Sequence, residues 1–592
     1  MSGWHALDTP ALTYIKLKTG VHPGAFEELI RDVPYTYIGE QLDEMGATYT
    51  NFLQPVRDIH LYSLSDDGQK PSRSLIYVYI FSAVGLVILL IACMNFMNLS
   101  TARSTTRSCE VGIRKVAGAH RNQLIRQFMG ESLITFCIAL MIALLMVGLL
   151  LPVYNNIAGS QFNTSILLHP AIIFSVIGLT VLVGIGAGMY PAFVLSAFRP
   201  ITVLRGSHKT DSRSLNMRKM LLIGQFTISI TLMVTTFIVY RQLHYMKNQS
   251  LGFAKEQKLV LTLSGWDIIE DNFDQVKNEF LQYPSITGAT ATSGVPGTFI
   301  NRLWIYPSEE EPENGQTPRI LRCDQDFISV YDIGILAGRP FQKEMGTDRL
   351  SGNFIINEAA VTSFGWNSPY EAVDRQIMIG DRRAKYRVIG VVENFHWFGL
   401  QNLIEPMVLR FSSTFRYITL NVDTKNLPET LVFVEKKYNE LFPNQVFDHF
   451  FVDTNFDRQY NFEERLGRIF RVFTFLGIFI ACLGLFGMAA FLAQQRTKEI
   501  GIRKILGASV LSLVQLFSRE FILLVAISNI VAWPIAYYAG AKWLQNFAYR
   551  TSIDWLTFIL AGALAIGIAL LTVSFQSIKA SLANPVDSLR YE

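Results

Sequence analysis

The sequence contains few charged residues for a chain of its length. Only 17% of its 592 residues are Asp, Glu, Lys or Arg, 50% are hydrophobic, and the mean hydropathy is +0.27. Soluble domains usually contain about 25% charged residues, so this composition favours a membrane protein. The net charge of +4 shows no basic or acidic excess that would indicate a nucleic-acid partner.

The residues that usually form metal or catalytic centres are also scarce. The chain has five cysteines but no CxxC pair, and its nine histidines lack metal-ligand spacing. It contains no GxxxxGK[ST] loop, GxSxG or HExxH motif. We therefore expect no metal, no cofactor and no catalysis in this chain, and any ATP hydrolysis must be carried out by a separate protein.

Long apolar stretches are abundant. A bilayer core of roughly 30 Å is crossed by about 20 apolar residues in a helix. Seven stretches meet this requirement, and no Asp, Glu, Lys or Arg lies between Glu131 and Arg199. The predicted spans are 76–98, 132–153, 171–194, 220–240, 472–493, 521–541 and 556–577.

The basic residues alternate between the loops. Lys and Arg gather after the first, third and fifth spans, whereas the loops at 154–170 and 545–554 together contain only Arg550. Because basic loops stay in the cytoplasm, this pattern predicts a multi-pass protein of the cell inner membrane with a cytoplasmic C-terminus. It places residues 1–74 and 241–467 outside, on the periplasmic side. No export signal precedes residues 1–74, so we expect the chain to lack an upstream part.

One basic segment occurs twice. Residues 107–131 and 496–520 align without gaps and are identical at eleven of 25 positions, far above the one or two expected by chance. Each copy follows one span and precedes two others, so the chain consists of two parallel halves. Residues 196–206 and 581–591 are also similar. The shared residues that we select as candidate site residues are Glu110, Gly112, Arg114, Lys115 and Gly118, and their counterparts Glu499, Gly501, Arg503, Lys504 and Gly507.

The outside regions show a weaker repeat. Strand-like runs at 258–263, 286–292, 302–306, 386–392 and 417–422, with helix-like runs at 271–283, 356–366 and 427–442, predict an α+β domain in two lobes. His396 is interpreted as a packing or turn residue, and GRPF at 338–341 as a tight turn. The predicted fold class is an α-helical membrane protein of seven spans with an extracytoplasmic α+β domain. Its segments are a domain remnant at 1–74, a three-span domain at 75–206, a linker and fourth span at 207–240, the α+β domain at 241–467 and a second three-span domain at 468–592.

The repeated segment predicts an elbow at the inner membrane surface. In both copies GIRK is followed by Gly-Ala and then by an amphipathic run, which favours a short helix, a bend at glycine and a second helix. Anchoring of the basic residues to membrane lipid explains the positive charges. It does not explain why Glu110 and Glu499 and the order of charges are kept in two diverged halves, so we favour docking of another protein.

The sequence resembles the MacB/FtsX-like permease family of ABC transporters. The resemblance rests on EVGIRKVAGA and EIGIRKILGA, on QPVRDIHLYS before a span, and on GRPF and VIGVVENFH in the outside domain. It implies a permease subunit, without a fused ATPase domain, that docks a cytoplasmic ABC ATPase dimer carrying ATP and Mg through residues 108–126 and 497–515. It also implies a missing first span and a first outside domain that is largely absent.

Three functions follow from these observations as hypotheses. The first is export of amphiphilic molecules such as antibiotics, peptides or lipoproteins, with a periplasmic adaptor or envelope protein as a further partner. The second is mechanical regulation of an envelope enzyme such as a cell-wall hydrolase. The third is a membrane receptor that works without an ATPase. A bound chain with a P-loop would separate the first two from the third.

Overall fold

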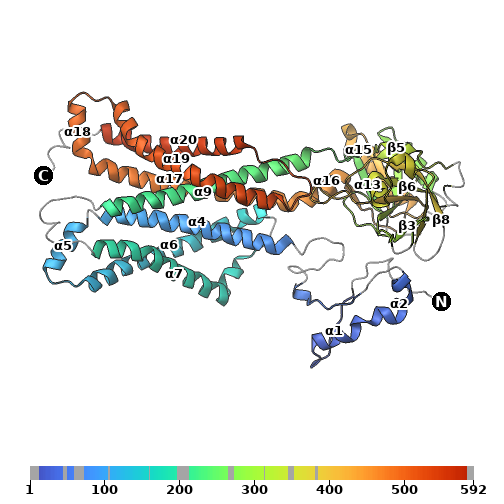
Figure 1. Cartoon of the computed structure of the whole chain (residues 1–592), viewed down its shortest axis with the longest axis horizontal. Helices are drawn as coiled ribbons and strands as arrows, with labels where there is room; N and C mark the ends of the chain where they lie inside the picture. Colours follow the sequence, from blue (N-terminus) through green and yellow to red (C-terminus); the bar gives the residue numbers. More distant parts are fainter. Residues whose placement is uncertain are drawn as a thin grey trace. The chain divides into compact units, whose positions relative to one another are not determined.

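The chain divides into two compact units. The computed structural model describes residues 13–44, 50–58, 73–104, 107–158, 161–196, 212–263, 273–311, 314–343, 348, 352–379 and 385–582 (Figure 1). One unit comprises residues 1–72, 244–461 and 546–550, and we call its part at 244–461 the sheet domain. The other comprises residues 73–243, 462–545 and 551–592, and we call it the membrane unit.

The described part of the N-terminal segment has two helices and one 3₁₀ turn. It contains α1 (Pro23–Arg31), α2 (Val33–Glu44) and the 3₁₀ turn η1 (Val56–Asp58). Residues 13–18 form no strand, although the sequence aligns them with 416–421, most of which lie in strand β10 (Tyr417–Val422). The interpretation of residues 1–74 as a domain remnant therefore stays a prediction.

The membrane unit contains all seven expected spans. Seven described helices are long and apolar enough to cross a bilayer, which confirms the predicted number. Figure 1 shows them running alongside one another. They are α4 (Arg73–Ser104), α6 (Arg121–Ala158), α7 (Pro170–Ser196), α9 (Ser212–Asn248), α17 (Asn461–Gln495), α19 (Val510–Leu544) and α20 (Trp555–Leu582).

Helix α9 is the most buried of the seven spans. Its apolar residues, including Phe226 and Val234, pack in one core with residues of α17, α19 and α20. Small polar side chains add hydrogen bonds between helices: Ser229 Oγ donates to the carbonyl of Gly477 at 3.3 Å, and Ser528 Oγ donates to that of Ile223 at 3.2 Å. Such hydrogen bonds help membrane helices to associate, because burying apolar side chains away from lipid gives little driving force.

The described residues of the sheet domain form a sheet of eleven strands. Their order is β11-β1-β10-β2-β4-β9-β6-β8-β7-β3, with β5 paired to β8. The strands are β1 (Lys258–Thr262), β2 (Ile286–Thr292), β3 (Ile305–Pro307), β4 (Arg319–Cys323), β5 (Ile335–Gly338), β6 (Phe354–Asn357), β7 (Gln376–Ile379), β8 (Lys385–Val392), β9 (Met407–Phe411), β10 and β11 (His449–Phe451). The main helices are α10 (Phe273–Leu281), α11 (Phe327–Val330), α13 (Glu358–Ser363), α14 (Pro369–Ala372), α15 (Leu427–Leu441) and α16 (Val452–Asp457).

The sheet narrows where β2 meets β4, through the single register pair Thr292 and Cys323. One core lies on the β1–β10–β2 side and includes Phe280 and Tyr438 of α10 and α15, while another surrounds β6 and β8. A third core, with Leu321 and Phe395, spans the narrow point. The two expected lobes therefore share one sheet.

Two sequence predictions for this domain need correction. The run predicted as a strand at 302–306 is part of a strand only from Ile305, and Arg302 forms an isolated bridge with Arg319. The run predicted as a helix at 356–366 begins in strand β6, and the helix starts at Glu358 after Asn357 accepts a hydrogen bond from the Ala360 amide. This side-chain cap fixes the start of the helix.

The GRPF motif begins at Gly338, the last residue of β5, and residues 339–341 are not assigned as a turn, so the tight turn predicted there is not found. Gly338 has φ of +76°, and a Cβ there would lie 2.2 Å from the Ile389 carbonyl oxygen, so only glycine fits. Arg339 donates to both carboxylate oxygens of Asp348 at 2.6 and 2.8 Å. His396 is buried, its pKa is lowered by burial, and its ring lies edge-on to Tyr549 at 4.8 Å. His396 is thus a packing residue, as expected.

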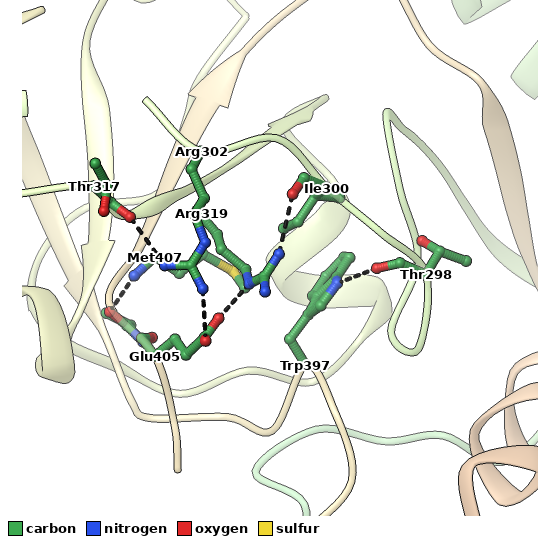
Figure 2. A network of polar contacts seen from close by, with 9 residues as sticks. Thr298, Ile300, Arg302, Thr317, Arg319, Trp397, Glu405 and Met407 are labelled. Atoms are coloured by element: carbon green, nitrogen blue, oxygen red, sulfur yellow. Dashed lines mark hydrogen bonds and ion pairs between the residues drawn. The ribbon is translucent and has the colours of Figure 1, made fainter. Parts of the chain in front are cut away.

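A buried arginine anchors the second lobe (Figure 2). Arg319 is 2% exposed; its Nη1 donates to the Ile300 carbonyl at 3.1 Å, and its Nε donates to Glu405 Oε2. The other carboxylate oxygen of Glu405 accepts from Arg302 at 2.8 Å, and Trp397 donates to the Thr298 carbonyl at 2.8 Å. The network ties the loop at 298–302 to the strands.

We expect Glu405→Gln to destabilise the sheet domain by about 3 kcal/mol, because it leaves the buried Arg319 charge without its counterion. Chemical denaturation of the full chain, followed by amide exchange in β4 and β9, measures this loss. The double variant Arg319→Met with Glu405→Leu should recover most of it, since the buried charge is removed and Arg302, whose side chain is 32% exposed, can be solvated. A Glu405→Gln protein as stable as the parent would contradict this view of the network.

The stability of the same domain depends on pH through the buried carboxyl group of Asp324. Burial raises the pKa of Asp324 from 3.8 to about 7, although a hydrogen bond from Thr290 opposes the shift. The folded state therefore holds a proton that the unfolded state releases above pH 3.8. Stability falls as pH rises from about 4 to about 7 and then levels off.

We expect Asp324→Asn to remove this dependence and to raise stability at pH 8 by roughly 3 kcal/mol. Amide exchange of β2 and β4 in the full chain at pH 4.5 and pH 8 is the measurement. Asp374→Asn is the matched control, because Asp374 is exposed and lies 3.6 Å from its ion-pair partner Arg387. A pH profile unchanged by Asp324→Asn would show that Asp324 titrates normally.

Candidate functional site: two matched elbows

The two copies of the repeated segment fold into the same elbow. We call residues 107–131 the first elbow and 496–520 the second. In the first, α5 (Ser108–Val116) is followed by α6, which begins at Arg121; in the second, α18 (Thr497–Ile505) is followed by α19, which begins at Val510. Figure 1 shows α5 and α18 at the same end of the membrane unit. The predicted short helix, bend and second helix are present in both.

A glycine turn ends each short helix. Gly118 has φ of +95° and Gly507 has φ of +88°. The Ala119 amide donates to the Arg114 carbonyl at 3.0 Å, and the Gly118 amide to the Lys115 carbonyl at 3.1 Å. The second elbow repeats both bonds, at 2.9 and 3.1 Å. This is the Schellman motif, which satisfies the last helical carbonyls and requires a residue with positive φ.

Each elbow lysine points inward, to the end of the third helix of its half. Lys115 Nζ donates to the Ser196 carbonyl at 2.6 Å, and Lys504 Nζ donates to the Ser581 carbonyl at 2.8 Å. Both serines are buried in the last turn of α7 or α20. Burial, together with the charge of Arg121, lowers the pKa of Lys115. The two lysines therefore hold each elbow against its own half.

Two further ion pairs recur in the copies. Arg107 Nη1 lies 2.6 Å from Glu131 Oε2, and Arg496 Nη2 lies 3.1 Å from Glu520 Oε1. The hydrogen bond and charge of Glu131 raise the pKa of Arg107. These pairs join the start of each short helix to the first apolar turns of the following span. They give the elbow a second attachment besides the lysine hydrogen bond.

The outward face of each short helix is partly charged and partly apolar. Glu110 and Arg114 form an ion pair of 2.8 Å, as do Glu499 and Arg503. Ile113 and Ile502, on the same faces by helical spacing, are 58% and 52% exposed. Val111 and Ile500 lie on the opposite faces and are buried against Phe128 and Phe517. Each helix thus packs with one face and presents the other.

The ten predicted site residues have different roles in the structure. Glu110, Arg114, Glu499 and Arg503 lie on the outward faces, whereas Lys115 and Lys504 bind backbone within the unit. Gly118 and Gly507 form the turns, and Gly112 is buried within α5. Gly501 lies in α18, and its surroundings are outside the described part of the chain. Ile113 and Ile502 are not among the predicted site residues, although the repeat contains them as an identical pair.

Arg218 corrects another sequence prediction. It is one of the basic residues between the predicted third and fourth spans, which the sequence places in a cytoplasmic loop. Arg218 instead lies in α9 within a candidate span and is 2% exposed. The helix begins at Ser212, earlier than the apolar run. Residues 197–211 lie outside the described residues.

Comparison with known proteins identifies the repeated part of the chain. The model of the FtsX-like permease C-terminal domain matches residues 82–200 and again 471–585. The macrolide export ATP-binding/permease protein MacB of Bdellovibrio bacteriovorus is 30% identical over 148 residues, which cover 25% of this chain and 22% of that protein. MacB of Rhodopirellula baltica is 30% identical over 128 residues, which cover 21% and 18% of the two chains. The matched part thus spans about a fifth of these relatives.

Solved structures of periplasmic or extracellular domains resemble part of this chain, with TM-scores below 0.3. The periplasmic region of MacB from Actinobacillus actinomycetemcomitans is 11% identical with a TM-score of 0.27 and covers 35% of this chain and 94% of that one. The extracellular domain of the transporter YknZ from Gram-positive bacteria is 12% identical with a TM-score of 0.23 and covers 32% and 97%.

The seven spans and the duplicated elbow define a polytopic membrane protein with two similar halves. Each half carries a region similar to the FtsX-like permease C-terminal domain, and the chain resembles MacB proteins over about a quarter of its length.

Gly507→Ala should destabilise the second elbow by about 1 kcal/mol, because alanine is strained at positive φ. A Cβ at Gly507 or Gly118 would meet no atom within 4 Å, so the effect is that of the backbone alone. Amide exchange in α18 should become about fivefold faster, whereas Gly507→Asn, which tolerates this conformation, should stay close to the parent. Equal exchange in the Ala and Asn variants would contradict the assignment.

Proposed function

We propose that this chain is the permease subunit of an ABC-type transporter and that a separate ATPase dimer docks on its two elbows. The observation that carries the proposal is the matched outward face of α5 and α18. An isoleucine lies beside a Glu–Arg ion pair at equivalent positions in both copies. Buried apolar anchors next to charged pairs are the usual composition of a docking surface.

The duplication suits a dimeric partner. Two elbows of the same fold lie at one end of the membrane unit (Figure 1), so each offers the same contacts to one subunit of a two-fold symmetric protein. The inward bonds of Lys115 and Lys504 join each elbow to the end of a span. A displacement of an elbow by the ATPase would therefore be passed to the helices of its half.

ATP and Mg bind to the ATPase in this proposal, and the work is delivered to the sheet domain. The curated relatives are named as macrolide exporters, and export of amphiphilic molecules is the transport role that we propose here. The large domain lies on the periplasmic side and the elbows and C-terminus in the cytoplasm, as the distribution of basic residues in the loops indicates.

The first experiment is purification of the full chain in mild detergent with identification of bound proteins. We expect a chain with a P-loop to co-purify. The double variant Ile113→Asp with Ile502→Asp should reduce its recovery at least about tenfold, because the apolar anchors are lost on both elbows. Membrane insertion should not change, since neither residue lies within a span.

A charge swap provides the matched control for helix stability. Exchanging Glu110 with Arg114, and Glu499 with Arg503, keeps an ion pair on each helix but reverses the charges that a partner meets. Loss of the ATPase from this variant supports recognition. Full recovery of the ATPase in both variants would contradict docking at the elbows, whereas changes at Lys115 or Lys504 would disturb the elbow itself and are less informative.

A further inference from the structure

A cavity lies at the elbow end of the membrane unit, between α9, α17 and α19. Its volume is about 350 Å³, which is within the range of small-molecule sites. Arg218, Arg496 and Glu520 contribute its charged wall, and Phe491, Phe521 and Leu524 are among its apolar lining residues. Arg496 and Glu520 belong to the second elbow, so the cavity lies near the ends of the spans.

Arg218 is a buried cation without a carboxylate partner in the described part of the chain. Its Nη2 donates to the Thr101 carbonyl at 2.7 Å, and its guanidinium lies 4.9 Å from the centre of the Phe491 ring. Its Nε and Nη1 are buried and have no hydrogen-bond partner. A buried charge normally requires a counterion and satisfied donors, so this guanidinium is suited to a negatively charged ligand.

The remaining wall indicates what kind of anion fits. Arg218, Lys219 and Arg496 line the cavity against one carboxylate, that of Glu520, which is already paired with Arg496. Guanidinium groups bind phosphate oxygens with two parallel hydrogen bonds. The aromatic and aliphatic wall beside them requires an apolar portion in the same ligand. Free phosphate satisfies only the first requirement.

We propose that this cavity binds the phosphate headgroup of an acidic amphiphile, with Arg218 as its principal ligand and with acyl chain against Phe521 and Leu524. The site depends neither on an ATPase partner nor on the transported substrate. It also belongs to the second half alone. With the spacing of the two elbows, the positions equivalent to Phe521 and Leu524 are Ser132 and Thr135, and both hydroxyls donate to carbonyls of their own helix.

The hydrogen bond from Arg218 to Thr101 suggests a second, structural role for Arg218. It would join α9 to the end of α4, and we call this role a clamp. A clamp requires only the Nη2 bond and would be indifferent to lipid. The test must therefore measure ligand binding directly and must include a variant that keeps the positive charge.

The experiment measures binding of dioleoyl phosphatidylglycerol to the full chain in neutral detergent by native mass spectrometry. Dioleoylglycerol, which has the same tails without phosphate, and inorganic phosphate are the comparison probes. We expect phosphatidylglycerol to bind at least about tenfold more tightly than dioleoylglycerol, and millimolar inorganic phosphate not to displace it. Arg218→Gln should weaken phosphatidylglycerol binding about tenfold, and Arg218→Lys should weaken it less.

Two further variants complete the design. Phe521→Ser with Leu524→Thr gives the second half the wall of the first, and it should weaken both lipid probes. Arg471→Gln removes an exposed arginine of α17 that does not line the cavity, and it should leave phosphatidylglycerol binding to the cavity unchanged. If Arg218→Gln fails to fold, Arg218→Lys and the wall variant still test the site.

Three results would overturn the proposal. Equal phosphatidylglycerol binding by the parent and by Arg218→Gln would leave Arg218 as a clamp only. Equal affinity for phosphatidylglycerol and dioleoylglycerol would remove the role of the phosphate. Displacement of the lipid by inorganic phosphate alone would show that the site takes free phosphate rather than an amphiphile.

Discussion

In each half of the membrane unit, an elbow lysine donates a hydrogen bond to the last turn of the third helix of that half, and this bond joins the elbow to the helix. Helix ends leave carbonyls without intrahelical partners, and a cation at the C-terminal end of a helix dipole is favourable. Lys115 and Lys504 meet both needs at Ser196 and Ser581. Because the glycine turn and the bracing ion pairs act on the same short helix, the elbow and the third span are held as one body.

This arrangement separates the two faces of each short helix. The inward face contains the lysine and a buried aliphatic residue, and it determines where the helix lies. The outward face contains isoleucine and a Glu–Arg pair whose charges satisfy each other. A protein that docks on the outward face would act on a short helix that is already joined to the spans. This helix is the support through which motion would be transmitted to the spans. The cavity beside Arg218 shares Arg496 and Glu520 with the second elbow, so a lipid bound there would lie next to that support.

Much of the fold could be predicted from local patterns. The seven spans follow from apolar runs of sufficient length, and the bends at Gly118 and Gly507 follow from glycine before a second amphipathic run. In the sheet domain, the alternating runs that became β2 and β10 were found with their bounds. Strands β4, β6 and β9 were missed, because short strands buried on both faces show little alternation. Arg218 was placed in a loop because positive charge usually ends a span, and only its contacts with Thr101 and Phe491 explain its burial.

The sequence by itself determined the membrane class, the two parallel halves and the position of the elbows, since these depend on hydrophobic length, repetition and the special backbone freedom of glycine. The tertiary structure decided which elbow residues face a partner and which face the protein. Lys115 and Arg114 are neighbours in the sequence with the same charge, yet one binds the end of α7 and the other remains on the surface. Helical spacing separates the two by about 100°, and only the position of the third helix determines which side is the inside.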